Sequence, residues 1–153
     1  MCLNKILCQI SENLPGLDFI APYGKLICIN HIMYQPYLNV SPVKSHRIAL
    51  TRLITSSHHL KIETGRWARP VTPQSERICP FCPGKQEDEF HLLLECSSYQ
   101  DIRQRYIPRY YLRRPSMLKA IQLINTTSKK LINALSKFVF LAFKKRQDSL
   151  RTT

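Results

Sequence analysis

The sequence predicts a mainly α-helical fold: a small helical domain with an irregular N-terminal arm and a long amphipathic C-terminal helix. Three observations lead to this prediction. The 153 residues include ten prolines and only four glycines, a balance that favours rigid, irregular connections over tight hairpins. Apolar residues recur at helical intervals after residue 128. Four residues of metal-ligand type follow one another as Cys-x2-Cys-x8-His-x4-Cys, so we expect the domain to be stapled by zinc.

The four candidate ligands are Cys79, Cys82, His91 and Cys96. Three thiolates and one imidazole form the ligand set of a closed, tetrahedral structural zinc site. Prolines fix the backbone of the segment Cys79–Gly84 and its glycine permits a tight reversal, so a short rigid turn directs both thiolates the same way. The alternative is a set of unrelated buried or free cysteines beside a histidine that is satisfied elsewhere.

The second half of this motif is predicted to be helical. Residues 87–89 are acidic, which suits the positive end of a helix, and the run Phe90–Glu95 continues it and carries His91. Five helical steps of about 100° each leave His91 and Cys96 roughly 140° apart. The helix is therefore expected to loosen or to end before Cys96.

Residues 37–146, and most closely 57–99, resemble the zinc-binding region that follows the polymerase in non-LTR (LINE-like) retrotransposon reverse transcriptases. In that family a basic helix, an SxHxLxIExGR segment, a Cys-x2-Cys pair, an acidic EDExHxLxxC run and a basic helical tail occur in this order. The matching positions are His59, Leu60, Ile62, Glu63, Gly65, Arg66, Cys79, Cys82, Glu87, Asp88, Glu89, His91, Leu93 and Cys96.

The resemblance covers the region after the enzyme and not the enzyme itself. The family's polymerase chemistry needs metal-binding aspartates, which conventionally stand as an Asp-Asp pair, and this sequence contains no Asp-Asp. The eight residues between Cys82 and His91 also differ from the four of the retroviral CCHC knuckle. The knuckle's mode of base recognition is therefore not implied.

The net charge of +13 is unevenly placed. Residues 97–153 contain 13 Lys or Arg and two acids, which gives +11, whereas residues 1–96 contain 10 and 8, which gives +2. Such asymmetry indicates a polyanionic partner. Nucleic acid, RNA or DNA, is favoured over an anionic membrane because the basic segment also carries tyrosines.

Cysteine usage and the N-terminus indicate an intracellular protein, in the nucleus or the cytoplasm. Residues 1–9 lack the apolar core and cleavage site of a signal peptide, so a reducing compartment is expected and Cys2, Cys8 and Cys28 are ordinary free thiols. No apolar run approaches the roughly 18 residues that a membrane span requires.

The chain divides by composition into three parts: an irregular arm or linker remnant (1–40), a helix plus zinc-binding module (41–106), and a basic helical tail (107–153). A helix is predicted from about 45 to 57, capped by Ser45. His58 and His59 follow it, and a structural role beside Trp67 is favoured over zinc binding.

Residues 60–67 alternate between apolar and polar side chains, as in an extended segment, but are too few for a free-standing sheet. We expect them to pack over the zinc module. Gly65 would allow a positive φ or a close approach of another chain segment. Arg66 has two equal interpretations, pairing with Glu63 or contacting phosphate.

After Cys96, Ser97 or Ser98 is expected to cap a helix that Pro108 ends or kinks. Arginines and tyrosines alternate through this region, a mixture able to bind phosphates and to stack on bases. The candidate nucleic-acid-binding residues are Arg103, Arg105, Tyr106, Arg109, Tyr110, Tyr111, Arg113 and Arg114. The alternative is a solvated basic face that its tyrosines anchor to the core.

Two further helices are predicted. Ser116 caps a short one from Met117 to about Leu123, and the final one begins after Ser128. Its core-facing stripe comprises Leu131, Leu135, Phe138 and Ala142, with Ile132, Val139 and Phe143 beside them. Phe140 and Leu141 lie off the stripe, which indicates either a second packed surface or a partner, and the surface Phe138–Phe143 is the candidate contact for a protein partner.

The sequence offers no persuasive nucleophile with a base and no carboxylate pair, so we expect no enzymatic activity. A Cys-His hydrolase would need one of the motif cysteines to be unliganded. The predicted function is a retrotransposon-derived, zinc-binding module that grips RNA or single-stranded DNA through its basic C-terminal part. The alternatives are a zinc-stapled protein-interaction module and a non-functional remnant of a reverse transcriptase reading frame.

Overall fold

The computed structural model describes residues 36–151, and this part of the chain is helical without any β-strand. The mainly α prediction is therefore confirmed. Most of the predicted irregular arm, and the thiols of Cys2, Cys8 and Cys28, lie outside the described residues. In chain order the elements are α3 (Pro36–Val40), α4 (Lys44–Ile54), α5 (Lys61–Trp67), η1 (Gln74–Glu76), η2 (His91–Glu95), η3 (Ser97–Tyr99), α6 (Gln100–Tyr106), α7 (Arg109–Leu112), α8 (Met117–Ile124) and α9 (Lys129–Arg151).

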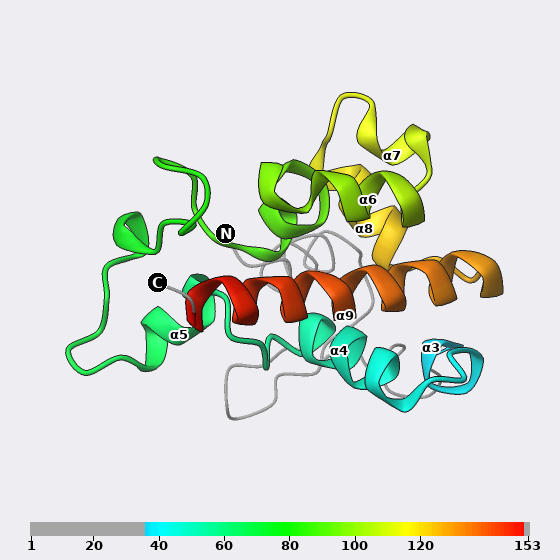
Figure 1. Cartoon of the computed structure of the whole chain (residues 1–153), viewed down its shortest axis with the longest axis horizontal. Coiled ribbons are helices and arrows are strands. Elements are labelled where there is room, and N and C mark those ends of the chain that lie inside the picture. Colours follow the sequence, from blue (N-terminus) through cyan, green and yellow to red (C-terminus); the bar gives the residue numbers. More distant parts are fainter. Residues whose placement is uncertain (1–35, 152–153) are drawn as a thin grey trace, which may run out of the picture.

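The other helices are arranged around α9. Figure 1 shows this 23-residue helix crossing the molecule, with α3 and α4 on one side and α6, α7 and α8 on the other. Its buried apolar residues are Ile132, Leu135, Phe138, Val139 and Ala142. Ile132, Leu135, Val139 and Ala142 recur every three or four positions with Phe138 beside them, as in a helix with one stripe facing a core. The predicted amphipathic C-terminal helix is confirmed.

The proposed partner surface Phe138–Phe143 is largely interior because α9 has neighbours on two sides. Three of its residues are fully buried: Phe138, Val139 and Ala142. Phe140 is half-buried and lies against the ring of His46 in α4, with 5.0 Å between the ring centroids. A continuous surface over these six residues is therefore not available to a partner.

Packing also crosses the boundaries suggested by composition. Tyr37 of α3 is buried, so the last residues of the segment 1–40 belong to the core. Ser41 approaches Ser136 of α9, with 3.2 Å between their hydroxyl oxygens. Because α9 packs on both α4 and α6, the segment 107–153 supplies the centre of the fold and is not an appended tail.

Two local predictions near the N-terminal half are corrected. The helix predicted from about 45 to 57 is α4, which begins at Lys44 after Val43 with no side-chain cap, so Ser45 lies inside it. Residues 61–67 form the helix α5 and not an extended segment. Alternation over so few residues cannot distinguish a helix from an extended segment. The start of the helix is instead fixed by a residue distant in the sequence, because Glu87 accepts hydrogen bonds from the backbone N–H groups of Lys61 (2.7 Å) and Ile62 (3.1 Å).

Glu87 also anchors α9. Its carboxylate accepts hydrogen bonds from Arg146 Nε at 2.7 Å and Nη2 at 2.8 Å, and both side chains are nearly inaccessible to solvent. Burial lowers the pKa of Arg146, but the hydrogen bonds and charge of Glu87 outweigh it and raise that pKa. The predicted role of Glu87 at the positive end of its own helix is therefore replaced by a bidentate ion pair with a residue 59 positions away.

We predict that Glu87→Gln destabilises the fold by about 3 to 5 kcal/mol, because it leaves a buried guanidinium without its counter-charge. Chemical denaturation would measure the change. Asp101→Asn is the matched control. Asp101 of α6 also forms an ion pair with α9, through Lys145 next to Arg146, but this pair is exposed to solvent. This control should leave stability nearly unchanged. Equal losses in both variants would contradict the structural role of Glu87.

Candidate metal centre

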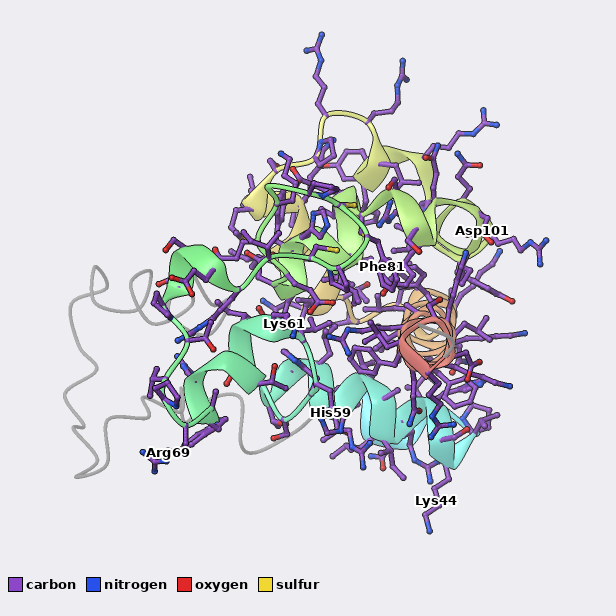
Figure 2. The ribbon with its side chains drawn as sticks, turned by 60° about the vertical axis from the view of Figure 1, so that its left-hand side comes forward. Lys44, His59, Lys61, Arg69, Phe81 and Asp101 are labelled. Carbon is purple, nitrogen blue, oxygen red and sulfur yellow. The ribbon has the colours of Figure 1, made fainter. Side chains whose placement is uncertain are left out.

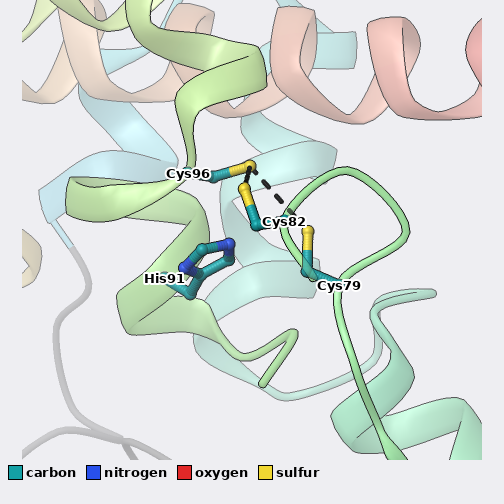
Figure 3. A group of neighbouring side chains, drawn as sticks. All are labelled: Cys79, Cys82, His91 and Cys96. Carbon is teal, nitrogen blue, oxygen red and sulfur yellow. Dashed lines mark hydrogen bonds between the residues drawn. The ribbon is translucent and has the colours of Figure 1, made fainter. Parts of the chain in front are cut away.

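A tight turn positions the first two candidate ligands. An isolated antiparallel bridge between Ile78 and Gln86 closes it, and within it Cys79 N–H donates to Lys85 O at 2.8 Å. Gly84 has a φ of 74°, a conformation that glycine adopts without a steric penalty. The predicted reversal at Gly84 is confirmed, and both cysteines lie on one side of the turn (Figure 3).

A π-helix positions the other two. In η2 the Cys96 N–H donates to His91 O at 2.7 Å, a bond that spans five residues instead of the four of an α-helix. Asp88 begins this turn, because its Oδ1 accepts the N–H of His91 at 2.7 Å. The wider turn returns Cys96 to the side of His91. The predicted loosening of the helix before Cys96 is confirmed.

Arg103 closes the end of the π-helix. Its guanidinium donates to the carbonyl oxygens of Leu93 (2.8 Å), Leu92 (3.0 Å) and Cys96 (2.8 Å), carbonyls that a helix end leaves unpaired. Burial is the main influence on Arg103 and lowers its pKa. Because the side chain is only 4% exposed, Arg103 is not available to a phosphate, and its place in the nucleic-acid-binding set is corrected.

The ligand atoms of Cys79, Cys82, His91 and Cys96 all lie within 4.8 Å of one another. The Sγ atom of Cys96 is 3.9 Å from that of Cys79 and 3.7 Å from that of Cys82. A tetrahedral site with metal–sulfur bonds of about 2.3 Å separates its sulfur atoms by about 3.8 Å, whereas a disulfide needs about 2.05 Å. The spacing fits thiolates around one ion.

The imidazole of His91 completes the set. It is 4% exposed, and neither ring nitrogen has a hydrogen-bond partner. Its Nδ1 is 3.6 Å from Glu95 Oε2, which leaves Nε2 as the ligand atom and places a carboxylate where it orients a metal-bound histidine. A buried unpaired imidazole is costly unless a further partner binds it. Figure 3 shows the four side chains gathered in one place, and they could hold a metal ion.

The electrostatics of the cluster favour ionised sulfur. The hydrogen bond from Cys96 is the main cause that lowers the pKa of Cys79 to about 4. The same hydrogen bond is the main cause that raises the pKa of Cys96, and burial raises it further. Burial lowers the pKa of His91, but the sulfur atoms of Cys79 and Cys82 outweigh it and raise that pKa to about 9. Thiols and imidazole thus share protons that a bound cation would displace.

The neighbouring histidines take no part in this cluster. His58 is buried and its Nε2 lies 3.0 Å from Glu89 Oε1, a structural pair. His59 is exposed, and both histidines line a shallow pocket with Trp67. This arrangement agrees with the predicted structural role of His58, but the sequence analysis did not identify Glu89 as its partner.

The segment α5 packs against the metal-binding turn as expected. A Cβ atom on Gly65 would lie 2.8 Å from Arg77 Nε, so the glycine serves a close approach and not a positive φ. Arg77 is held there by bonds to Ile62 O (2.9 Å) and Thr72 O (3.0 Å). Arg66 pairs with Glu63 at 3.1 Å, the first of its two predicted roles.

The remaining candidate nucleic-acid residues lie on α6, α7 and the loop before α8. Five are exposed, and we call them the arginine–tyrosine surface: Arg105, Arg109, Tyr110, Arg113 and Arg114. Tyr106 and Tyr111 are half-buried; Tyr106 lies under Lys137 Nζ at 5.2 Å, and Tyr111 packs edge-on to Tyr110. Figure 2 shows nitrogen-tipped side chains projecting from this end into solvent.

Lys119 of α8 fixes the backbone of this surface. Its Nζ donates to the carbonyl oxygens of Tyr110 and Arg113, and it lies 4.8 Å from the centroid of the Tyr110 ring. The predicted cap of α8 is confirmed, because Ser116 Oγ accepts the N–H of Lys119 at 3.4 Å. The arginines therefore project from an ordered turn and not from an unsupported loop.

The chain matches no family model, no curated protein and no solved structure with which it was compared. The resemblance to the retrotransposon region therefore depends on the motif residues alone. Among the described helices, none combines the length and the apolar character needed to cross a bilayer.

We predict that the purified chain contains one metal ion and that Cys82→Ser releases it. Structural metal sites contribute about 10 to 16 kcal/mol in finger peptides, which exceeds the usual stability of a small domain. The thermal transition of the variant should therefore fall sharply or disappear. Cys28→Ser, outside the predicted ligand set, is the control. Elemental analysis finding no metal in the unaltered chain would refute the site.

A second prediction separates the two arginines at positions 103 and 105. Arg103→Met should lower the free energy of unfolding by about 3 kcal/mol, because three buried carbonyls lose a charged donor. Arg105→Met, on the exposed face of the same helix, should leave it nearly unchanged. Denaturation of both variants with metal present tests this difference. An unaffected Arg103→Met would show that the cap is dispensable.

Proposed function

We propose that the chain is a zinc-binding module, derived from a retrotransposon, that binds RNA or single-stranded DNA without catalysing a reaction. Zinc is favoured because three thiolates and one imidazole in a tetrahedral arrangement are typical of its structural sites. The motif resemblance supports the same metal and the same origin. Cysteine usage supports an intracellular, reducing location.

The proposed role of the metal is structural. All four ligands come from the protein, and three of them are buried, so no coordination position remains for a substrate. When bound, zinc would cross-link the turn of Cys79 and Cys82 to the π-helix of His91 and Cys96. Arg103 then links that π-helix to α6, which leads to the arginine–tyrosine surface.

The observation that carries the proposal is the arginine–tyrosine surface. Four exposed arginines lie within five residues of Tyr110 along the chain, and Tyr110 itself is 59% exposed. Arginine binds phosphate oxygens through a planar fork of donors, and an exposed aromatic ring stacks on bases of any sequence. Arginines alone would suffice for solubility, whereas an exposed tyrosine beside them adds a ring on which an unpaired base can stack. The combination therefore favours binding of single-stranded nucleic acid. Binding is therefore proposed to be weakly sequence-specific.

We predict that affinity for single-stranded RNA falls with salt at a log-log slope near −2.8, from about −0.7 for each of four arginine contacts. Changing Arg105, Arg109, Arg113 and Arg114 together to Ala should nearly abolish this slope. Tyr110→Ala should weaken binding but keep the slope, because stacking releases no counterions. Fluorescence anisotropy against salt concentration measures both effects.

The control is a pair of exposed basic residues far from this surface. Figure 2 places Lys44 and Arg69 on the opposite side of the molecule from the loop between α7 and α8. The double variant Lys44→Ala/Arg69→Ala should leave the slope in place, whereas Arg109→Ala/Arg113→Ala should reduce it by about 1.4. Absence of RNA and DNA binding at low salt, with metal bound and the fold intact, would reject the proposed function.

A further inference from the structure

A groove with a volume of about 630 Å³ runs between α4 and the C-terminal half of α9. Along α9 it is lined by Phe140, Phe143, Gln147 and Leu150, which recur every three or four residues. This second stripe of α9 is distinct from the one that faces the core. From α4 the groove receives Ile48 and, one turn further on, Arg52.

The floor of the groove is apolar and open to solvent. Ile48 is 41% exposed and Leu150 is 42% exposed, and the two phenylalanine rings between them are half-buried. The stripe from Phe140 to Arg151 covers eleven helical steps, or about 16 Å. The lining from α4 is shorter and runs from Ser45 to Arg52. Two helices that present such stretches beside each other form the kind of groove into which a third, amphipathic helix packs.

The rim of the groove is basic. Arg52, Lys144 and Arg151 are exposed there, and none of the described residues that line the groove is acidic. Two other basic residues in the lining are already compensated within the protein, Arg146 by Glu87 and His58 by Glu89. Within residues 36–151, none of the ion pairs includes Arg52, Lys144 or Arg151, so the positive charge of the groove belongs to the rim, where it would face the flanks of an occupant.

From this combination we propose that the groove binds an amphipathic α-helix of a partner protein, with apolar residues on one face and acidic residues on its flanks. A second copy of this chain is a poor occupant, because residues 97–153 carry +11 and would meet a rim of like charge. Nucleic acid is also disfavoured, although the rim could contact phosphates, because the two phenylalanine rings are half-buried and the exposed floor residues Ile48 and Leu150 are aliphatic, which leaves no exposed ring for base stacking.

The groove and the arginine–tyrosine surface lie on opposite sides of α9. Figure 1 shows α4 on one side of that helix and α7 with α8 on the other. The protein could therefore hold a nucleic acid and an acidic helix at the same time. The partner site does not depend on the proposed function, and separate variants test the two.

The test uses the full chain and a fluorescent synthetic peptide of about 15 residues, enough to fill the groove. The peptide carries Leu at positions i, i+3, i+7 and i+10, Glu on the flanks and Ala elsewhere. We expect saturable binding by fluorescence anisotropy. A second peptide with Lys in place of every Glu should bind at least about tenfold more weakly.

Three variants locate the binding. Ile48→Glu and Leu150→Glu should each weaken the Glu peptide about tenfold or more, because a carboxylate would enter the apolar floor. Leu118→Glu is the matched control, since Leu118 is 64% exposed on α8, away from the groove. Changing Arg52, Lys144 and Arg151 to Gln should weaken the Glu peptide and reduce its salt dependence. Circular dichroism and metal content verify the fold of each variant.

Several results would overturn the inference. They are equal binding of the Glu and Lys peptides, unchanged binding by Ile48→Glu and Leu150→Glu, and no saturable binding of the Glu peptide. Loss of RNA binding in the groove variants would instead assign the groove to the nucleic-acid surface. A dimer in sedimentation that Leu150→Glu dissociates would assign it to a second copy of the chain.

Discussion

The buried carboxylate of Glu87 is the constraint on which the arrangement of this protein depends. It lies between the two halves of the metal-binding motif, receives two donors of Arg146 from α9, and accepts the first backbone N–H of α5. A carboxylate with so little contact with water is tolerated only if each oxygen has partners. Satisfying this one group brings together three segments that are distant in the sequence and attaches the metal-binding module to the helices.

Buried arginines explain how a chain of such high positive charge forms a compact core. Arg77, Arg103 and Arg146 are all interior, and each directs its guanidinium to backbone carbonyls or to a carboxylate. The long planar side chain suits this role because it supplies several donors in fixed directions. The net charge of +13 therefore includes arginines that lie in the interior, and it exceeds the charge carried at the surface. Among the described residues, the exposed basic side chains include those of the arginine–tyrosine surface and the groove rim, together with dispersed ones such as Lys44 and Arg69.

The sequence could predict features that depend on neighbours along the chain. The ligands Cys79, Cys82, His91 and Cys96 follow from spacing, and the five-residue step from His91 to Cys96 already required a loosened helix. The stripe of α9 follows from helical period. By contrast, the helical state of residues 61–67 and the interior position of Arg103 arise from contacts with Glu87 and with the end of the π-helix. Helical period is the local signal that separates Arg103 from the exposed Arg105. Arg103 is four residues from both Tyr99 and Ile107, which are buried, so it falls on the inward side of α6, a difference that composition does not reveal.

The π-helix has a consequence for how this region tolerates change in length. Leu92, Leu93 and Leu94 are consecutive and all buried, so most of the turn is enclosed and only Glu95 is exposed, whereas an ordinary amphipathic helix exposes a whole face. Substitution by another apolar side chain alters one contact at a time. Insertion or deletion of a single residue between His91 and Cys96 shifts a ligand and rotates all three leucines together. This segment should therefore tolerate exchanges that keep the residue count between the two ligands better than it tolerates a change in length.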